Sequence, residues 1–215
     1  VTTMHKNSNN NSSQYRNELK FRIIRTAMPL FKQKGIKAVR MDDIANILSI
    51  SKRTLYEIYN NKEDLLLEGV KNDYYEMTKR IQDYAMTAEN EIDIVVTFFR
   101  MKFADLDSIT PKFFTELDKY EKVKLFMQEY KTEQQTEATE FIRKCIENGF
   151  FVPSINYGII QEVCDYVMSS VISNSLYKKY TLKDIFCNFF IVLLRGFCTE
   201  KGLVLLDLYL KKTYI

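Results

Sequence analysis

Turn-forming residues are scarce in this sequence: 6 of its 215 residues are glycine and 3 are proline. Sandwiches and barrels of β-strands need many tight turns, so this scarcity disfavours them and favours long helices with few breaks. The longest uncharged apolar run, residues 185–194, is also short, because about 20 residues are needed to cross a bilayer. No signal peptide precedes the first predicted helix. We therefore expect a cytoplasmic protein with no membrane partner.

Residues that bind metals or drive catalysis are few as well. The single histidine, His5, lies in a polar stretch, which leaves little support for histidine-based catalysis or metal binding. The four cysteines are 19, 23 and 11 residues apart, which matches no zinc or redox motif. GxSxG, Gly-rich phosphate-loop and Glu-x-x-His motifs are also missing. We expect no metal, no cofactor and no enzymatic activity.

The net charge of +3 conceals an uneven distribution. Residues 14–62 carry eleven Lys or Arg and four Asp or Glu, whereas residues 63–215 carry 19 basic and 24 acidic residues. A basic segment joined to an acidic remainder indicates that the basic segment meets a polyanion. The alternative is a solvated basic face without a partner.

The apolar residues recur at helical spacing, and the sequence predicts an all-α fold. Residues 1–13, rich in Asn and Ser, predict a disordered tail. A helix follows that contains Pro29 and ends at Gly35, then come two short helices over 42–48 and 52–59. The last two are joined by a tight turn, which is the outline of a helix-turn-helix. We therefore predict a DNA-binding domain over 14–62 and a larger helical bundle over 63–215.

The start of the third helix has the chemistry of a DNA-reading helix. Residues 51–54, Ser-Lys-Arg-Thr, offer two cations and two hydroxyls. An α-helix fits the major groove, and the side chains of its N-terminus reach base edges. Leu55 and Ile58 are spaced to pack inward, which leaves Tyr56 and Tyr59 nearer the DNA.

Residues 35–45 (GIKAVRMDDIA) and 50–65 (ISKRTLYEIYNNKEDL) together resemble the TetR/AcrR family of bacterial transcriptional regulators. The match joins many fixed spacings but covers less than a quarter of the chain; the rest agrees only in length and helical pattern. The resemblance implies an all-helical homodimer that binds palindromic operators in double-stranded DNA. It also implies release of the operator when a small molecule enters the second domain.

Two residues depart from the family pattern. Arg40 stands where the family usually has Thr or Ser, whose hydroxyl caps the second helix in a box that Asp43 would complete. Arg40 cannot accept that hydrogen bond but can reach a phosphate. Ser49 stands in the turn where the family commonly has Gly; if the backbone there is left-handed, serine costs about 1 kcal/mol.

The resemblance assigns DNA contacts to particular residues. Lys52, Arg53 and Thr54 lie where the family reads bases, and Tyr56 and Lys62 lie where it grips phosphate. Tyr59 replaces the usual Phe, and burial is the favoured alternative for it. The predicted DNA-binding residues are Arg40, Ser51, Lys52, Arg53, Thr54, Tyr56, Tyr59 and Lys62.

The body of the chain is rich in aromatic residues, with 15 Phe and 14 Tyr in the whole sequence. Helices are predicted over 62–84, 89–105, 112–117, 119–148, 157–178, 182–199 and 202–212. Aromatic side chains in such helices are most often plain core, but they can also enclose an apolar cavity for an aromatic or apolar effector. The candidate ligand-binding residues are Phe99, Phe103, Phe126 and Tyr130.

Two apolar stripes on the last long helices are candidates for a dimer seam. Two such helices from each subunit would form a four-helix bundle. The alternative is that both stripes pack inside one subunit. The candidate interface residues are Val163, Val167, Val171, Phe189, Leu193 and Phe197.

Three classes of function stay open. The leading one is a ligand-responsive regulator, a repressor, released from its operator by an effector. The second is an effector-independent DNA-binding architectural or division protein, whose body would lack a cavity. The third, a small helical enzyme or carrier, has the least support because no catalytic motif is found. A cavity in the body separates the first two, and an operator-binding assay separates both from the third.

Overall fold

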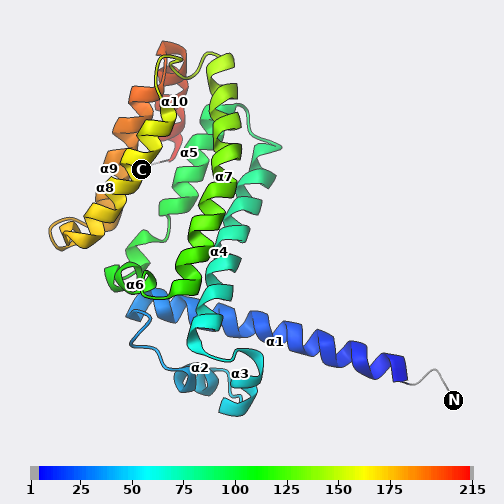
Figure 1. Ribbon diagram of the computed structural model, residues 1–215. Coiled ribbons are helices and arrows are strands. Elements are labelled where there is room, and N and C mark those ends of the chain that lie inside the picture. Colours follow the sequence, from blue (N-terminus) through cyan, green and yellow to red (C-terminus); the bar gives the residue numbers. More distant parts are fainter. Residues whose placement is uncertain (1–4, 214–215) are drawn as a thin grey trace. The chain divides into compact units, whose positions relative to one another are not determined.

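The computed structural model describes residues 5–213, with the side chains of residues 13–211 (Figure 1). Every regular element in that part of the chain is a helix, so the predicted all-α fold is confirmed. The α-helices are α1 (His5–Lys34), α2 (Met41–Ile47), α3 (Lys52–Ile58), α4 (Lys62–Ala85), α5 (Glu91–Phe103), α6 (Pro111–Leu117), α7 (Glu121–Glu147), α8 (Tyr157–Ser173), α9 (Leu182–Phe197) and α10 (Glu200–Thr213). Two short 3-10 helices are η1 (Leu106–Ser108) and η2 (Leu176–Lys178). None of the helices described is long and apolar enough to cross a membrane.

The helices form two compact units. The first consists of the chain up to Asp73 together with residues 112–126, and the second consists of residues 74–111 and 127–215. The first unit therefore contains α1 to α3, the start of α4, α6 and the start of α7. It is larger than the DNA-binding domain predicted over 14–62, because α6 and the residues after it pack with the N-terminal helices.

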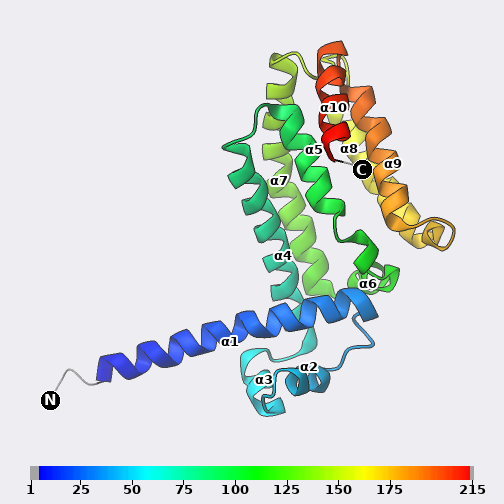
Figure 2. The same cartoon turned by 180° about the vertical axis from the view of Figure 1, so that it is seen from behind.

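One apolar face of α1 organises the core of the first unit. Ile23, Ala27 and Phe31, spaced four residues apart, are completely buried, as are Ile44 of α2 and Leu55 of α3. Views from opposite sides show α2 and α3 side by side along α1 (Figures 1 and 2). This packing places the short helices α2 and α3 on a rigid support, which neither would have alone.

Helix α1 is longer than the sequence predicted. The structure continues it through residues 5–13, where the composition predicted a disordered tail; residues 1–4 lie outside the described part of the chain. Each residue added to an existing helix gains one backbone hydrogen bond, so even weak helix formers extend it. Pro29 lies inside the helix, and Gly35 ends it with a φ of 86°, a backbone conformation that favours glycine.

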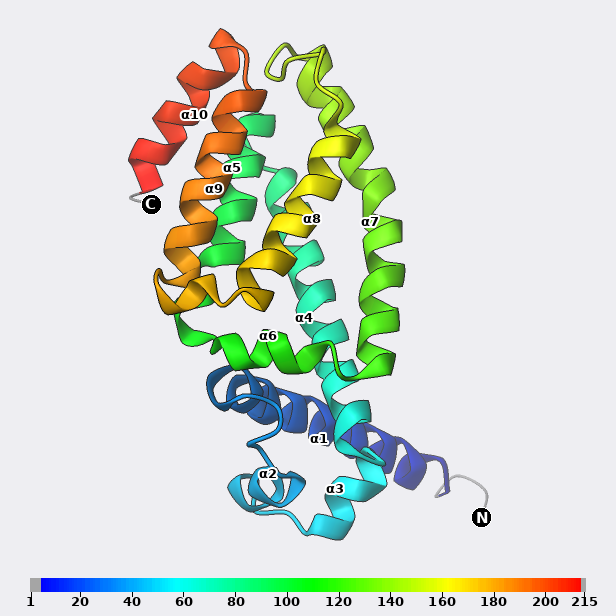
Figure 3. The ribbon, with the colours of Figure 1, turned by 60° about the vertical axis from the view of Figure 1, so that its left-hand side comes forward.

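Helix α5 is central to the second unit and lies beside α9 and α10 (Figures 2 and 3). Its residues Ile92, Val95 and Val96 are buried against apolar side chains of the other helices. Cys145 and Cys198 belong to the same core, and all four cysteines are free. Burial raises the pKa of the Cys145 thiol to about 12 and that of Cys198 to about 11, so both are protonated, unreactive core residues at neutral pH.

Candidate DNA-binding site

The turn between α2 and α3 closes with a complete Schellman motif. The Ile50 N–H donates to the Ala45 carbonyl at 3.0 Å, and the Ser49 N–H donates to the Asn46 carbonyl at 3.1 Å. Ser49 has a φ of 54°, so it adopts the left-handed conformation usually given to glycine. The strain expected for serine at this position is therefore present in the structure. The turn sets the direction in which α3 leaves α2.

The N-terminus of α3 is capped as the sequence predicted. The Ser51 Oγ accepts a hydrogen bond from the Thr54 N–H at 3.0 Å, and the two hydroxyls are 2.8 Å apart. Leu55 is completely buried beneath the helix, which fixes the rotation of α3 about its axis. Lys52 and Arg53 consequently project into solvent, with 62% and 88% of their side chains exposed.

Both of these cations have an acidic neighbour in the free protein. The Lys52 Nζ lies 2.9 Å from the Asp42 carboxylate on α2, and the Arg53 Nε lies 2.9 Å from the Glu57 carboxylate one turn along α3. These hydrogen bonds raise the pKa of each cation. Exposed ion pairs of this kind are weak, so a phosphate or base edge can replace the carboxylate. The sequence analysis did not identify Asp42 as a group that competes with DNA for Lys52. Its position at the start of the short second helix could have indicated this role.

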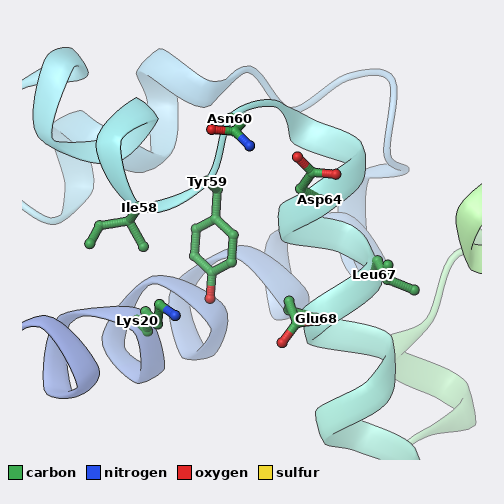
Figure 4. A pocket seen from close by; sticks show the side chains of 7 residues that line it. All are labelled: Lys20, Ile58, Tyr59, Asn60, Asp64, Leu67 and Glu68. Atoms are coloured by element: carbon green, nitrogen blue, oxygen red, sulfur yellow. The ribbon is translucent and has the colours of Figure 1, made fainter.

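The two tyrosines of α3 separate. Tyr56 is 38% exposed and stands beside Lys52, whose Nζ is 5.9 Å from the centre of its ring. Tyr59 is only 5% exposed, which agrees with the alternative of burial, and its contact with DNA stays a prediction. Figure 4 shows its ring directed between α1 and α4, at a pocket of about 280 Å³ lined by Lys20 and Glu68 among others. Burial raises the pKa of the Tyr59 hydroxyl to about 12, and the charge of Glu68 adds to the rise.

Lys62 makes hydrogen bonds inside the first unit, and its predicted contact with phosphate stays a prediction. Its Nζ donates to the Ile36 carbonyl at 2.9 Å and to the Val39 carbonyl at 3.0 Å. Burial lowers its pKa, while the charge of Glu116 opposes that effect. The loop between α1 and α2 has carbonyls without helical partners, and the ammonium of Lys62 satisfies two of them. Lys62 therefore fastens this loop to α4.

Arg40 leaves the cap of α2 half made. Asp43 accepts a hydrogen bond from the Arg40 backbone N–H at 2.8 Å, which is one half of a capping box. The Arg40 side chain has no acceptor for the other half and is exposed at the N-terminus of α2. It is thus available to a phosphate, as predicted, at the expense of one helix-capping bond.

Two further contacts of the first unit were not foreseen from the sequence. The Arg16 guanidinium donates to the Glu57 carbonyl at 3.0 Å, so α1 supports the C-terminal turn of α3. The Lys37 backbone N–H donates to the Glu116 carboxylate of α6 at 2.7 Å. The partners of these two hydrogen bonds are separated by 41 and 79 positions in the sequence, and no local sequence pattern predicts contacts between residues so far apart.

The predicted ligand-binding residues divide between the two units. Phe99 and Phe103 of α5 stack with ring centres 5.6 Å apart and face Phe190 of α9 at 4.5 and 5.3 Å. Tyr130 instead contacts the ring of Tyr74 at 4.7 Å. Phe126 belongs to the first unit and is buried there beside Lys71. Only Phe99 and Phe103 therefore form one cluster.

The predicted dimer residues also separate by burial. Val163 of α8 is 49% exposed, while Val167, Phe189 and Leu193 are half-buried. Val171 is 5% exposed and Phe197 packs inside the unit, 5.9 Å from the ring of Phe151. Val171 is buried and Phe197 is half-buried against the core, so less of their apolar surface is open to a second copy, and their place at a seam stays a prediction. Exposed apolar residues that the prediction omitted are Ile159, Tyr166 and Val192.

Comparison with known proteins agrees with this architecture. A model of the family described as "Bacterial regulatory proteins, tetR family" matches residues 23–68. The negative transcriptional regulator IcaR of the biofilm operon icaADBC in Staphylococcus epidermidis is 39% identical over 54 residues, which are 25% of this chain. The match spans 29% of the length of that relative.

Solved structures resemble the chain over most of its length. A TetR-family regulator from Cytophaga hutchinsonii has a TM-score of 0.64 at 14% identity, over 86% of this chain and 98% of that one. A regulator from Saccharomonospora viridis, solved in complex with choline, has a TM-score of 0.60 at 20% identity, over 91% and 96% of the two chains. At such identities the likeness is one of fold. The matched family and IcaR are both described as transcriptional regulators.

Proposed function

We propose that this chain, whose residues 23–68 match the TetR family of bacterial regulatory proteins, is a repressor that binds a palindromic operator as a homodimer and leaves it when a small effector binds. The start of α3 is the observation that carries the proposal. Buried Leu55 and the Ser51 cap hold this helix so that Lys52 and Arg53 extend outward with Tyr56 and Arg40 nearby. Cations at a helix N-terminus are suited to base edges and phosphates of the major groove. IcaR is a negative transcriptional regulator, which supports repression.

A homodimer is part of the proposal because a single short reading helix makes few contacts. Two copies on successive major grooves, about 34–36 Å apart, supply the affinity and read a palindrome. The unpartnered apolar side chains on α8 and α9 support pairing with a second copy. Tyr166 is 76% exposed and Val192 is 70% exposed, and both are large apolar residues. Large exposed apolar side chains of this kind are typical of a protein–protein interface.

The second unit is proposed to hold the effector. The aromatic side chains of α5 and α9 offer a surface to a flat apolar molecule. The choline complex of the Saccharomonospora viridis regulator supports a small-molecule effector in this fold. Effector and operator must each weaken the other's binding by the same factor, because coupling between two sites is reciprocal.

The proposal is tested by selecting an operator from a random duplex library with the purified protein and measuring affinity for it and for unselected DNA. Lys52→Ala and Arg53→Ala should each reduce the preference for the selected operator by about 5–150-fold, because one base contact is lost. Lys144→Ala, an exposed cation of α7, is the matched control and should bind as wild type. Unchanged selectivity of both α3 variants would refute the assignment of α3 as the reading helix.

A further inference from the structure

Lys102, on the last turn of α5, is a cation that the DNA-binding function does not use. Solvent reaches its side chain, yet the protein around it lowers the pKa of its ammonium by burial, an effect that the negative charge of Asp165 on α8 opposes. Burial disfavours the charged form of an ammonium, and the charge of Asp165 reaches Lys102 from another helix. Lys102 therefore lies beside the Phe98 ring and within reach of the charge of Asp165 on α8, at a place that solvent reaches.

The ammonium of Lys102 has no anionic partner among the side chains that the structure describes. No carboxylate there lies within ion-pair distance, and its one recorded contact places Nζ 5.3 Å from the centre of the Phe98 ring. Asp165, the acid whose charge acts on it, already forms an ion pair with Lys131 of α7. Two cations from α5 and α7 thus share one carboxylate, which leaves one positive charge without compensation.

An apolar wall continues from this charge. The Phe98 ring meets Phe99 at 5.2 Å, and Phe99 in turn meets Phe190 of α9 at 4.5 Å. Phe98, Phe99 and Phe190 are all half-buried, so their rings are not fully covered by protein. A positive group at the edge of partly open aromatic rings is complementary to a molecule with an apolar ring system and an acidic group.

We propose that the effector of the second unit is an aromatic or amphipathic anion, whose carboxylate or similar acidic group pairs with Lys102 while its apolar part packs on Phe98 and Phe99. This inference rests on the proposed function and narrows its effector to one chemical class. An anion would supply the partner that a desolvated ammonium lacks, and such charge-assisted bonds are the strong ones in a protein interior. A neutral or cationic compound would leave the charge of Lys102 unpaired or would be repelled by it.

The test compares two dyes that differ by one acidic group: anilinonaphthalene sulfonate and phenylnaphthylamine, which lacks the sulfonate. Fluorescence titration of the full chain, without DNA, gives the affinity of each. In Lys102→Met the affinity for the sulfonate should fall by about tenfold, the size of one charge-assisted hydrogen bond, and the affinity for the neutral dye should stay the same. Lys102→Arg should bind the sulfonate dye with the affinity of wild type, since arginine keeps the positive charge.

Two further variants complete the design. Asp165→Asn removes the competing carboxylate and frees Lys131. This variant should therefore bind the sulfonate dye more tightly, and its affinity for the neutral dye should equal that of wild type. Lys144→Met removes an exposed cation of α7 and is the matched control, expected to match wild type. The proposal would be overturned if Lys102→Met lost affinity for both dyes equally, or if its affinity for the sulfonate dye did not change.

Operator binding, measured separately without dye, distinguishes this inference from the function on which it rests. Wild-type protein that selects no operator but shows the Lys102-dependent preference for the sulfonate would refute the repressor and keep the anion site. Wild-type protein that selects an operator through Lys52 and Arg53 but shows no such preference would refute the anion site alone.

Discussion

Single residues of the first unit set how readily it meets DNA, and Asp42 is the least expected of them. Its carboxylate holds Lys52 in the free protein at 2.9 Å, so Lys52 must exchange this partner for DNA. Asp42 also adds a negative charge close to the predicted phosphate path. A carboxylate at this position is therefore a restraint on binding to any sequence.

Asp42→Asn should accordingly bind both operator and random DNA more tightly, by about fivefold at low salt, because a repulsive charge is removed and Lys52 is released. Titration of a labelled duplex at several salt concentrations measures the effect, which should shrink as salt rises. Asp83→Asn, an exposed acid of α4 in the second unit, is the control. Weaker binding by Asp42→Asn would show that Asp42 positions Lys52 rather than restrains it.

The hydroxyl of Tyr59 makes the stability of the protein depend on alkaline pH. Its pKa is raised from 10.0 to about 12, so the folded protein holds the proton while the unfolded chain releases it. Stabilisation is present below pH 10 and is lost as the pH rises toward 12. Tyr59→Phe should therefore gain stability relative to wild type between pH 10 and 12, and urea unfolding at pH 8 and 11 measures it. An identical difference at both pH values would contradict the burial of this hydroxyl.

Lys62 should contribute to the stability of the folded protein more than to the electrostatic attraction of DNA. Lys62→Met removes two hydrogen bonds to loop carbonyls and should lower the free energy of unfolding by about 1–2 kcal/mol. Lys34→Met, an exposed cation at the end of α1, should leave it unchanged. Thermal unfolding measures both variants. If Lys62→Met is as stable as wild type but its DNA binding depends less on salt, Lys62 contacts a phosphate, as the sequence predicted.

At the scale of elements, α2 and α3 are each seven residues long and depend on their ends. Helices this short do not persist alone in water, so capping and packing hold them. The end of α2 is closed by the Schellman motif at Ser49 and the start of α3 by the Ser51 cap. The start of α2 is the exception, because Arg40 cannot cap it.

Arg40→Thr should therefore trade DNA affinity for stability. A threonine hydroxyl can accept the Asp43 N–H and should stabilise the protein by about 0.5–1 kcal/mol. Loss of the guanidinium should weaken binding to operator and random DNA alike, since a phosphate contact carries no sequence information. Urea unfolding and DNA titration on the same preparation measure both effects. A variant that gains stability without losing affinity would exclude Arg40 from the interface.

For the whole molecule, the exposure of the apolar residues on α8 and α9 indicates which of them can form a dimer interface and which pack inside one subunit. Phe197 lies inside the second unit against Phe151 and Tyr157, at ring distances of 5.9 and 5.3 Å. Val192, on the same helix, is 70% exposed. One helix thus has a covered face and an uncovered face, and only the uncovered one is free to pair with a second copy.

Val192→Glu should give a folded monomer, whereas Phe197→Glu should destabilise the second unit, because only the latter places a charge against the apolar core. Sedimentation and circular dichroism of the two variants and of wild type measure assembly and folding separately. Val204→Glu, on the exposed face of α10, is a control that should stay dimeric. A wild-type protein that sediments as a monomer at micromolar concentration would refute the proposed dimer.

Local patterns in the sequence determined most of the helices, the turn between α2 and α3, the cap at Ser51 and the resemblance of residues 35–65 to the TetR family. These depend on residues within a few positions of each other, such as Ser51 and Thr54, whose chemistry can be read along the chain. The exposure of Lys52 and Arg53 could be predicted as well, since helical spacing relative to Leu55 fixes their side of the helix.

Tertiary packing decided the rest, because burial depends on residues far apart in sequence. Tyr59 is buried because α1 and α4 enclose its ring, and Lys62 bonds to the loop before α2 because the carbonyls of that loop need donors. Phe197 is half-buried because it packs against Phe151 and Tyr157. The charge of Lys102 looks ordinary in a helical sequence, and only the helices packed around α5 desolvate it. Spacing along one helix predicts which residues share a face, but the neighbours of that face are set by the fold.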